Sequence, residues 1–362
     1  MDKKALIAMS GGVDSSVAAY LMKERGFECL GVTMKLYNNE DIGISREKTC
    51  CSLDDIEDAR AVAFSLKMPY YVFNFKDDFE EKVIKKFIST YESGGTPNPC
   101  IDCNRYLKFK ALLHRAEEIQ YGYVVTGHYA RVEYDEASGR YLLKKGIDET
   151  KDQSYVLYFL TQAQLSHILF PLGNYRKSEI RKIAEENGFI NAAKRDSQDI
   201  CFVPDGDYAK FIEGHENKTY PKGDFVTADG EILGKHNGII RYTIGQRKGL
   251  GIAYKEPLYV CAKDIEKNTV TLGNAESLLT KEVIASDVNL ISVSSIEAPM
   301  KLKAKTRYNM KEQPCTAVQL DDNTLKVIFD EPQRAITAGQ ALVLYDGDTV
   351  LGGGPIVSEE SR

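Results

Sequence analysis

The stretch Ser10-Gly11-Gly12-Val13-Asp14-Ser15-Ser16 joins a short apolar run to a helical pattern without a pause. Residues 5–9 predict a first strand, and the apolar stripe that follows predicts a first helix. Two glycines allow a tight turn that brings backbone N–H groups against an anion, and the helix N-terminus adds partial positive charge. The sequence therefore predicts a phosphate-binding loop between the first strand and the first helix.

Strands and helices alternate on the C-terminal side of this loop. Further strands are predicted at residues 27–36, 70–75 and 123–126, and helices at residues 56–66, 79–91, 107–119 and 177–187. Such alternation predicts a parallel sheet that is covered by helices on both faces. The fold class is therefore α/β in the first part of the chain.

After about residue 205 the pattern changes to turn signals every 8–12 residues, with short β-rich runs between them. Examples are residues 238–244, 258–262, 302–306 and 325–329. This spacing favours small β-barrels or sandwiches. The sequence thus predicts an α/β domain at 1–204, followed by two small, mostly-β modules at 205–280 and 281–362.

Composition limits the class of protein. The chain has 362 residues, of which 43% are hydrophobic and 28% charged, as in globular proteins of two or three domains. No apolar run approaches the roughly 18 residues of a membrane-spanning helix, and the N-terminal run is too short for a signal peptide. We expect a cytoplasmic protein with no membrane partner. The eight cysteines are too sparse for a disulfide scaffold, so they are read as thiols, metal ligands or catalytic groups.

The loop contains neither the lysine of a Walker A motif nor a GxGxxG pattern. The string SGGxDS after a first strand resembles the PP-loop ATP pyrophosphatases, whose domain is of the adenine nucleotide alpha hydrolase-like type. The resemblance implies cleavage of ATP between the α and β phosphates, with Asp14 holding a Mg²⁺ bound to ATP. The plain alternative is a helix N-cap with a flexible entry. The expected nucleotide pocket comprises Ala8, Met9, Ser10, Gly11, Gly12, Val13, Asp14, Ser15, Met34 and Gly127.

Three cysteines lie in notable contexts. Cys100 and Cys103 form a CxxC on a Pro-stiffened loop ahead of a helix, and Cys201 lies in the string SQDICF. A helix N-terminus lowers the pKa of a thiol, which predicts thiolate character for the first two. A zinc half-site and an inert packing thiol at Cys100 are the duller alternatives. The adjacent Cys50 and Cys51 receive no role.

Several strings together resemble the tRNA-specific 2-thiouridylases (the MnmA family) over essentially the whole chain. They are PNPCxxCN, Gly127-His128-Tyr129-Ala130, Lys151-Asp152-Gln153-Ser154, SQDICF and Thr337-Ala338-Gly339-Gln340. The resemblance implies an enzyme that places sulfur at C2 of the wobble uridine in tRNAs for Lys, Glu and Gln. ATP adenylates the base and releases pyrophosphate, and AMP then leaves. A cysteine desulfurase or a sulfur-relay protein is the implied donor.

The resemblance also assigns roles to the cysteines. Cys201 is expected to carry the persulfide, and Cys103 to be the partner thiol that releases the sulfur and closes a Cys103–Cys201 disulfide. The best-known members have an Asp at the position of Cys100, where a thiol is a poor substitute. As an alternative, Cys100, Cys103 and Cys201 could hold a 4Fe-4S cluster. The persulfide route is favoured.

A net charge of −6 gives no general argument for RNA binding, but local patches are basic. Residues 300–311 carry five positive charges and no acid, residues 234–251 carry four and no acid, and residues 176–195 have a net charge of three. Such patches would contact phosphates, although each alone could be a solvated face. Tyr129 and Tyr308 are expected stacking platforms. By resemblance, the tRNA contacts are Asn98, Pro99 and Cys100 at the target base, with His128, Lys151, Asp152, Gln153, Arg307, Tyr308 and Gln340.

Two other functions are compatible with parts of the pattern. One is a PP-loop ligase acting on a small carbonyl compound with a zinc-bound CxxC, which needs neither the third cysteine nor the β modules. The other is a non-enzymatic tRNA-binding or metal-sensing protein, against which the intact Asp14, Ser15 and cysteines argue. Pyrophosphate exchange that depends on tRNA separates the three functions.

Overall fold

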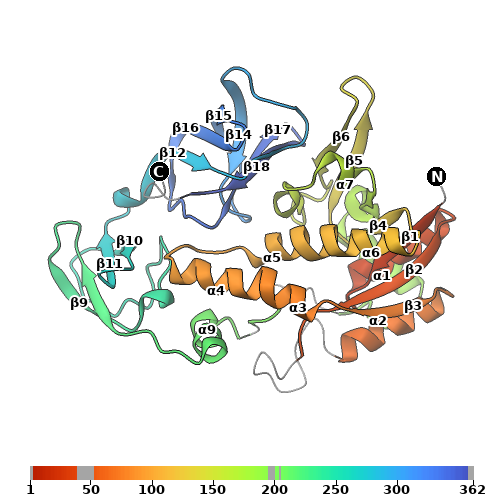
Figure 1. Ribbon diagram of the computed structural model, residues 1–362, viewed down its shortest axis with the longest axis horizontal. Coiled ribbons are helices and arrows are strands. Elements are labelled where there is room, and N and C mark those ends of the chain that lie inside the picture. Colours follow the sequence, from red (N-terminus) through yellow and green to blue (C-terminus); the bar gives the residue numbers. More distant parts are fainter. Residues whose placement is uncertain (1–2, 39–52, 195–199, 204, 358–362) are drawn as a thin grey trace.

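The computed structural model describes residues 3–38, 53–194, 200–203 and 205–357. Its first part is built on a parallel sheet with the strand order β3-β2-β1-β4-β7 (Figure 1). The strands are β1 (Lys4–Ala8), β2 (Glu28–Lys35), β3 (Tyr70–Asn74), β4 (Tyr123–Val125) and β7 (Ile168–Leu169). The predicted α/β domain is confirmed, and the short edge strand β7 is an addition that the pattern does not indicate.

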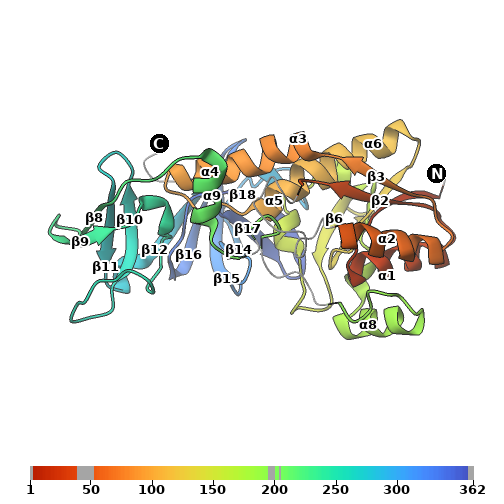
Figure 2. The ribbon, with the colours of Figure 1, turned by 90° about the horizontal axis from the view of Figure 1, so that it is seen from below.

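Both faces of this sheet are covered, as Figure 2 shows. Neighbouring residues of β1 point to opposite faces, so Ala5 and Ile7 lie in one apolar core and Leu6 in another. The first core is closed by α1 (Val13–Glu24), α2 (Leu53–Ser65) and α8 (Lys177–Glu186). The second is closed by two long composite helices, α3-η1-α4 (Lys76–Phe79, Glu80–Ile84, Lys85–Glu92) and α5-η2-α6 (Pro99–Asp102, Cys103–Ala111, Leu112–Glu118). This double cover explains the continuous apolar runs of the strands.

The C-terminal part forms an antiparallel sheet that continues into the first domain. Its order is β12-β16-β15-β14-β17-β18-β6-β5, with β13 paired to β18. The last two strands in that order are a hairpin of the α/β domain, which the sequence analysis does not predict. The bounds are β5 (Ala130–Asp135), β6 (Arg140–Lys145), β12 (Leu279–Ala285), β13 (Asn289–Leu290), β14 (Met300–Lys305), β15 (Gln313–Asp321), β16 (Thr324–Arg334), β17 (Ala341–Asp346) and β18 (Thr349–Pro355).

The central module has its own sheet, with the order β10-β11-β8-β9, preceded by α9 (Tyr208–Glu216). The strands are β8 (Gly223–Val226), β9 (Ile232–His236), β10 (Tyr259–Asp264) and β11 (Thr269–Gly273). The expectation of a strand at residues 238–244 is wrong. Gly238 takes φ +106°, and a 3₁₀ turn follows, η5 (Ile239–Arg241), whose two isoleucines are buried.

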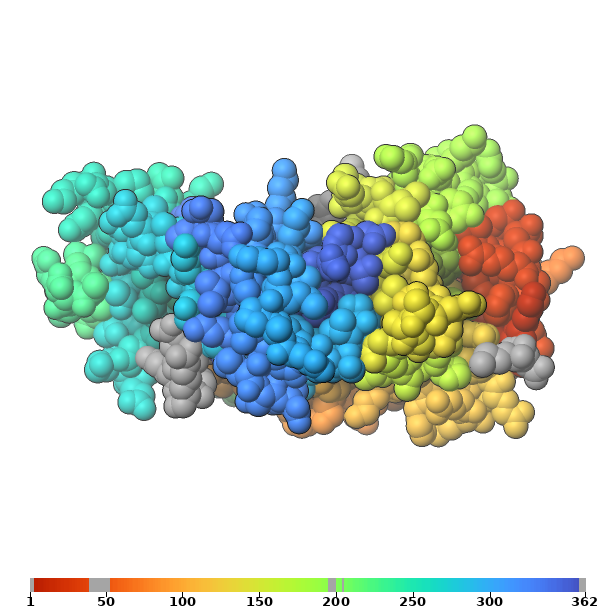
Figure 3. Space-filling view, turned by 90° about the horizontal axis from the view of Figure 1, so that it is seen from above, coloured from red at the N-terminus to blue at the C-terminus, as the bar shows by residue number. Residues whose placement is uncertain are grey.

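Short elements connect these units: η3 (Ser154–Leu157), α7 (Gln162–Leu165), η4 (Pro171–Asn174) and η6 (Glu276–Leu278). In Figure 3 the C-terminal barrel (blue) lies between the central module (cyan) and the β5–β6 hairpin (yellow). The hairpin belongs to the first predicted domain in sequence but to the C-terminal sheet in space. The domain boundaries predicted from the sequence, at residues 204/205 and 280/281, therefore stay predictions. None of the helices in the described ranges is long and apolar enough to cross a membrane.

Candidate active site

The phosphate-binding loop follows β1 directly and is closed by its own serines. The backbone N–H of Ser10 donates to Ser15 Oγ at 3.1 Å, and the hydroxyls of Ser15 and Ser16 donate to the Gly12 carbonyl at 3.0 Å. Gly11 has φ +73°, and a Cβ there would lie 2.4 Å from the Asp55 carbonyl oxygen. Only glycine fits that position, so the loop is shaped before a ligand arrives.

The other expected nucleotide-pocket residues meet at the carboxyl ends of the same strands. Met9 donates its N–H to the Val32 carbonyl at 2.8 Å and accepts from the Thr33 hydroxyl at 2.6 Å. A Cβ on Gly127, after β4, would lie 2.9 Å from Asp14 C and Ser15 N. The start of α1 therefore packs directly on the end of β4, as the resemblance requires. Half-buried Ala8 and Met34 and buried Val13 lie at the ends of β1 and β2 and the start of α1.

Asp14, the expected Mg²⁺ residue, is already engaged. Both of its carboxylate oxygens lie 2.8 Å from Lys177 Nζ, and Tyr129 donates its hydroxyl to Oδ1 at 2.7 Å. Lys177 is buried at the first position of α8, and its N–H donates to Asp148 Oδ2. Because an ammonium group faces the carboxylate, the donor set does not fit a divalent cation held directly by Asp14.

A second lysine supports the loop from outside. Lys194 Nζ contacts the Gly11 carbonyl at 3.2 Å and the carboxylates of Asp55 and Asp58 at 2.6 Å each. Burial works to lower the pKa of Lys194, but the bonds to the two carboxylates raise it overall. Asn191 Nδ2 donates to the same carbonyl at 3.0 Å and to Ser16 Oγ at 2.9 Å. The segment before the Cys201 string thus braces the phosphate loop.

The thiols of the CxxC differ in exposure. Cys100 is exposed in α5, whereas Cys103 is half-buried at the start of η2. Burial raises the pKa of Cys103 to about 11, and the neighbouring Cys100 and Asp102 add to the rise. The expectation of a helix-stabilised thiolate is therefore wrong for Cys103, which lies beyond the first turn of the helix that begins at Pro99 and whose thiol pKa is raised by desolvation. Asp102 is also buried, and its carboxylate accepts from Lys86 at 2.6 Å.

Cys201 lies on another segment. It is half-buried, and its carbonyl accepts the Tyr37 hydroxyl at 2.9 Å. The next residue, Phe202, packs edge-on against Phe79 and Phe87 at 5.6 and 5.1 Å. Across the described ranges, no group of three or more His, Cys, Asp and Glu side chains is placed to hold a metal ion. As arranged here, the three cysteines do not fit a 4Fe-4S cluster. Cys50, Cys51 and residues 196–199 lie outside the described residues.

The C-terminal barrel contacts the α/β domain along a seam. On the α/β side, the seam comprises the cysteine loop (residues 93–98) and Asp152. Tyr308 donates its hydroxyl to the Asp152 carbonyl at 3.1 Å, and burial together with Asp152 and Cys100 raises its pKa to about 12. Gln340 Nε2 donates to the carbonyls of Thr96 at 2.9 Å and Pro97 at 3.2 Å. The structure therefore brings together residues that the sequence separates by more than 150 positions.

Comparison with known proteins identifies three consecutive domains and full-length relatives. Family models match residues 3–205 ("tRNA methyl transferase HUP domain"), 209–274 ("tRNA methyl transferase PRC-barrel domain") and 280–356 ("Aminomethyltransferase beta-barrel domain"). The chain is 52% identical over 356 residues to the tRNA-specific 2-thiouridylase MnmA of Clostridioides difficile (strain 630), covering 98% of both chains. It is 54% identical to MnmA 1 of Thermoanaerobacter sp. (strain X514), with the same coverage. The chain belongs to the MnmA family of tRNA-specific 2-thiouridylases.

The word methyl transferase in two of the family descriptions differs from the names of these full-length relatives, and identity above 50% over the whole chain favours the latter. Among solved structures, "Crystal structure of a 4-thiouridine synthetase - RNA complex with bound ATP" is 20% identical. It covers 59% of this chain and 50% of that chain with a TM-score of 0.34, which is too low to bear on function.

Several residues that the MnmA resemblance assigns to tRNA face inward. His128 is buried, with Nδ1 2.6 Å from the Thr126 hydroxyl, and burial holds its pKa well below the usual value. Gln153 Oε1 accepts the N–H of Tyr129 at 3.0 Å. The expectation that Tyr129 is a stacking platform is wrong, since its ring is buried. Contacts of His128 and Gln153 with RNA stay predictions.

Of the other residues assigned to tRNA, Asn98, Lys151 and Asp152 are half-buried and Pro99 is buried. Asn98 is half-buried and its carbonyl accepts the N–H of Ile101, while Pro99 is buried at the first position of α5. Lys151 and Asp152 are half-buried, and Asp152 Oδ1 accepts the N–H groups of Gly146 and Ser154. Asn98 and Pro99 directly precede Cys100, which is compatible with their predicted role at the target base, and contacts of Lys151 and Asp152 with RNA stay predictions.

The basic patches of this family member are weaker than their sequences suggest. In residues 300–311, Lys301 and Lys303 are exposed, whereas Lys305 and Arg307 are half-buried and have lowered pKa values because of burial. In residues 234–251 the side chains of Lys235 and Arg241 pair with Asp224 and Glu213. Arg247 and Lys248 there are exposed. In residues 176–195, Lys177 and Lys194 contact the phosphate loop and its Asp14, so their charges are not part of an exposed patch.

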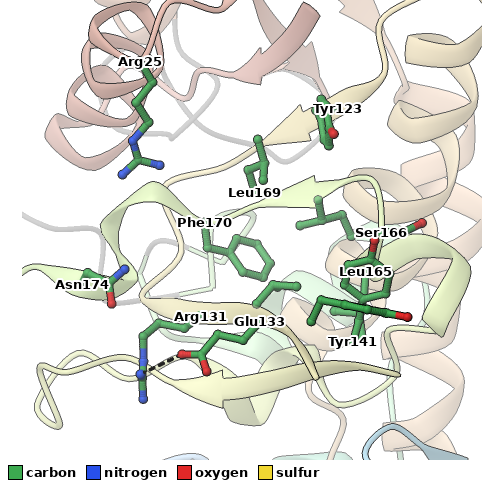
Figure 4. A pocket seen from close by; sticks show the side chains of 13 residues that line it. Arg25, Tyr123, Arg131, Glu133, Tyr141, Leu165, Ser166, Leu169, Phe170 and Asn174 are labelled. Atoms are coloured by element: carbon green, nitrogen blue, oxygen red, sulfur yellow. Dashed lines mark hydrogen bonds and ion pairs between the residues drawn. The ribbon is translucent and has the colours of Figure 1, made fainter. Parts of the chain in front are cut away.

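A cleft in the described structure lies away from this site. Its volume is about 300 Å³, and it lies between the β5–β6 hairpin and strands β4 and β7 (Figure 4). Tyr123 and Ile168 begin their strands, so the cleft opens at the amino ends of β4 and β7, whereas the phosphate loop lies at the carboxyl ends. Parallel sheets bind ligands at their carboxyl ends, so the cleft is not assigned to the nucleotide.

Lys177 and Lys194 contact the phosphate loop, and the sequence analysis did not assign either of them to the nucleotide pocket. Both were counted as members of a basic patch, because nothing local distinguishes them from solvated lysines. The one signal is the position of Lys177 at the start of a helix, where a lysine is unfavourable to the macrodipole and so needs another reason to be there.

Proposed function

We propose that this protein is an ATP-dependent tRNA-uridine 2-sulfurtransferase that makes 2-thiouridine at the wobble position. The observation that carries the proposal is the full-length identity with 2-thiouridylases, in a chain that retains both the phosphate loop and the cysteines. ATP is the activating substrate. The tRNAs for Lys, Glu and Gln are the proposed substrates, and the cytoplasm is the proposed compartment.

The nucleotide end would activate the base. The phosphates of ATP fit the N–H groups of the loop and the start of α1. The uridine O2 attacks the α-phosphorus and pyrophosphate leaves, which forms the O2-adenylate. Lys177 lies 2.8 Å from Asp14, so it can balance that carboxylate and stabilise charge that develops on the phosphates. Mg²⁺ bound to ATP supplies charge screening of the phosphates, and no step here depends on its ligands.

The cysteines would then deliver sulfur. The terminal sulfur of a Cys201 persulfide attacks C2 of the adenylated base, and AMP leaves with the C–O bond pair. The Cys103 thiolate attacks Cys201 Sγ, so the S–S bond of the adduct breaks, 2-thiouridine is released and a Cys103–Cys201 disulfide forms. A reducing dithiol must supply two electrons before the next cycle. A desulfurase or a relay protein would reload Cys201.

Cys103 must lose its proton for this step. Its pKa of about 11 in the RNA-free protein keeps the thiolate scarce at neutral pH. We therefore expect the bound tRNA to change the surroundings of Cys103. The contacts proposed for the RNA are Asn98, Pro99, Cys100, Lys151, Asp152 and Tyr308, with His128, Gln153, Arg307 and Gln340 depending on rearrangement.

The test uses protein purified without oxygen, with iron and labile sulfide quantified. Pyrophosphate exchange is measured with and without unmodified tRNA, and 2-thiouridine is detected by nucleoside mass spectrometry. Exchange and thiolation that both require tRNA support the proposal. Exchange without tRNA would indicate a small-molecule ligase, and none at all a binding protein.

The same preparation separates the two sulfur routes. Activity of iron-free protein given a persulfide donor supports the route through Cys201. About four irons per chain with iron-dependent activity would instead make the three cysteines cluster ligands and overturn the persulfide steps.

A further inference from the structure

A turn of the C-terminal barrel contacts the loop that precedes α5, the helix in which Cys100 lies. This barrel turn is residues 337–340, and the cysteine loop is residues 93–98, between α4 and α5. Thr96 donates its N–H to the Ala338 carbonyl at 2.9 Å. Gln340 Nε2 donates to the Thr96 and Pro97 carbonyls at 2.9 and 3.2 Å. Three backbone groups of the cysteine loop are therefore bonded to another domain.

The first half of the cysteine loop is held differently. The N–H groups of Gly94 and Gly95 donate to carbonyls of α4, at Tyr91 and Thr90. From Thr96 onward the bonds cross to the barrel, and α5 with Cys100 begins after Asn98. The position of Cys100 thus depends on the barrel turn more than on the helix that precedes the loop.

The contact is close enough to require glycine. Gly339 has φ +88°, and a Cβ there would lie 2.8 Å from Thr90 Cγ2 and 3.0 Å from the Thr96 carbonyl oxygen. Arg307 stiffens the turn from behind, since its Nη2 donates to the Ala335 carbonyl and the Thr337 hydroxyl at 2.5 and 3.0 Å. The barrel therefore presents a shaped, braced surface to the cysteine loop.

We propose that Gln340 is a positioning residue, which fixes the Cys100–Cys103 segment through the backbone of Thr96 and Pro97. Its amide N–H donors are directed at the cysteine loop, which leaves them unavailable to a phosphate or a base in this arrangement. The inference rests on the proposed function only in taking Cys100 and Cys103 as reacting groups. A misplacement of reacting groups by about 1 Å can cost a factor of 10² in rate, so such a clamp matters for turnover.

Two variants disturb the clamp in different ways. Gln340→Leu removes the donors at nearly constant volume, and Gly339→Ala pushes the barrel turn off the cysteine loop without removing any side chain that could touch RNA. Gln313→Leu is the matched control, since its amide on β15 of the same barrel donates only to the Lys311 carbonyl among the described residues. Circular dichroism and thermal midpoints check that each variant is folded.

Three readouts distinguish positioning from RNA contact. Hydrogen exchange of the peptide spanning residues 94–101 is measured in RNA-free protein and needs no activity, so it remains informative even if thiolation fails. We expect hydrogen exchange to be about tenfold faster in both variants than in the wild type, because local opening limits exchange. In the control variant the exchange rate should not change. The kcat should fall about tenfold while the Kd for tRNA stays within twofold.

Unchanged exchange in Gln340→Leu would overturn the proposal. So would a tenfold weaker tRNA Kd with kcat intact, since Gln340 would then be an RNA contact. A loss of kcat in Gln340→Leu that Gly339→Ala does not share would also overturn it.

Discussion

The nucleotide end and the cysteine end of this site are built in different ways. The phosphate loop is closed by its own serines, braced by Lys177 and Lys194 and fitted against β4 through Gly127. The cysteines lie on two separate segments, and the loop that leads to Cys100 is held by a barrel more than 240 residues away in sequence. The phosphate loop is thus held by contacts within the α/β domain, whereas the loop before Cys100 is held by a contact from the barrel.

This difference has a chemical reason. Phosphoryl chemistry depends on donors fixed in place before the reaction begins, so a rigid loop is an advantage. A persulfide and its partner thiol are prone to oxidation, and thiolate character sets that susceptibility. Cys103 is half-buried and has a pKa of about 11, so we expect it to resist oxidation in the RNA-free protein. From this comparison of the two ends we expect bound RNA to complete the sulfur-transfer end.

The largest effect is expected for Cys201→Ser, which breaks the sulfur end and spares the nucleotide end. Thiolation should fall by more than about 10³, because no other group carries the sulfur. Pyrophosphate release dependent on tRNA should persist. Cys261→Ser, at a half-buried cysteine of the central module, is the control. If the Cys201 variant still makes 2-thiouridine, the proposed route fails.

Lys177→Met tests the nucleotide end. We expect tRNA-dependent pyrophosphate exchange to fall about 10²–10³-fold, because a charge that stabilises the phosphates is lost. The Kd for tRNA should be unchanged, as Lys177 is buried next to Asp14. Lys182→Met, on the exposed face of the same helix, is the control. Equal loss of RNA binding and exchange would contradict a separate nucleotide end.

The double variant Lys301→Ala/Lys303→Ala tests whether the barrel strand β14 contacts the phosphates of the tRNA. Both side chains are exposed on β14, so the Kd for tRNA should weaken. The slope of log Kd against log salt should flatten by about 1–2, since each phosphate contact contributes just under one. Lys85→Ala, an exposed lysine of α4 outside the three basic patches, is the control and should leave the slope unchanged. An unchanged slope in the double variant would show that these lysines are solvent-exposed but do not contact RNA phosphates.

The smallest effect concerns the other side of the cysteine loop, where Lys263 of the central module lies against Gly94. Burial lowers the pKa of Lys263 from 10.5 to about 8, and its Nζ donates to the Tyr242 carbonyl. Below pH 8 the folded protein carries a buried charge, which is a penalty that disappears as pH rises to 10.5. Lys263→Met should therefore be more stable at pH 7 by about 1–3 kcal/mol.

Urea unfolding at pH 7 and pH 9.5 measures this difference. The advantage of the Lys263 variant should shrink at the higher pH, because the wild-type lysine is then neutral in the folded state. A constant advantage at both values would show that packing, and not charge, is responsible.

The sequence predicted the parallel sheet and the phosphate loop because both depend on local patterns. The string from Ser10 to Ser16 contains its own turn, donors and helix start. The same string gives no sign that Asp14 faces Lys177, because that lysine lies 163 positions further along the chain. The β5–β6 hairpin was missed for the same reason, as its neighbour β18 comes some 200 residues later. The raised pKa of Cys103 depends on burial, which a CxxC pattern does not encode.

The pairing of β6 with β18 has a consequence for anyone who divides this chain. Thr349 and Val350 align with Lys144 and Leu143, so one edge of β6 is covered by β18, a strand that follows about 200 residues later in the chain. A fragment that stops before the barrel would expose that edge, with Leu143 beside it, to other molecules. Because β18 is synthesised about 200 residues after β6, the hairpin can complete its sheet only after the end of the barrel has been made.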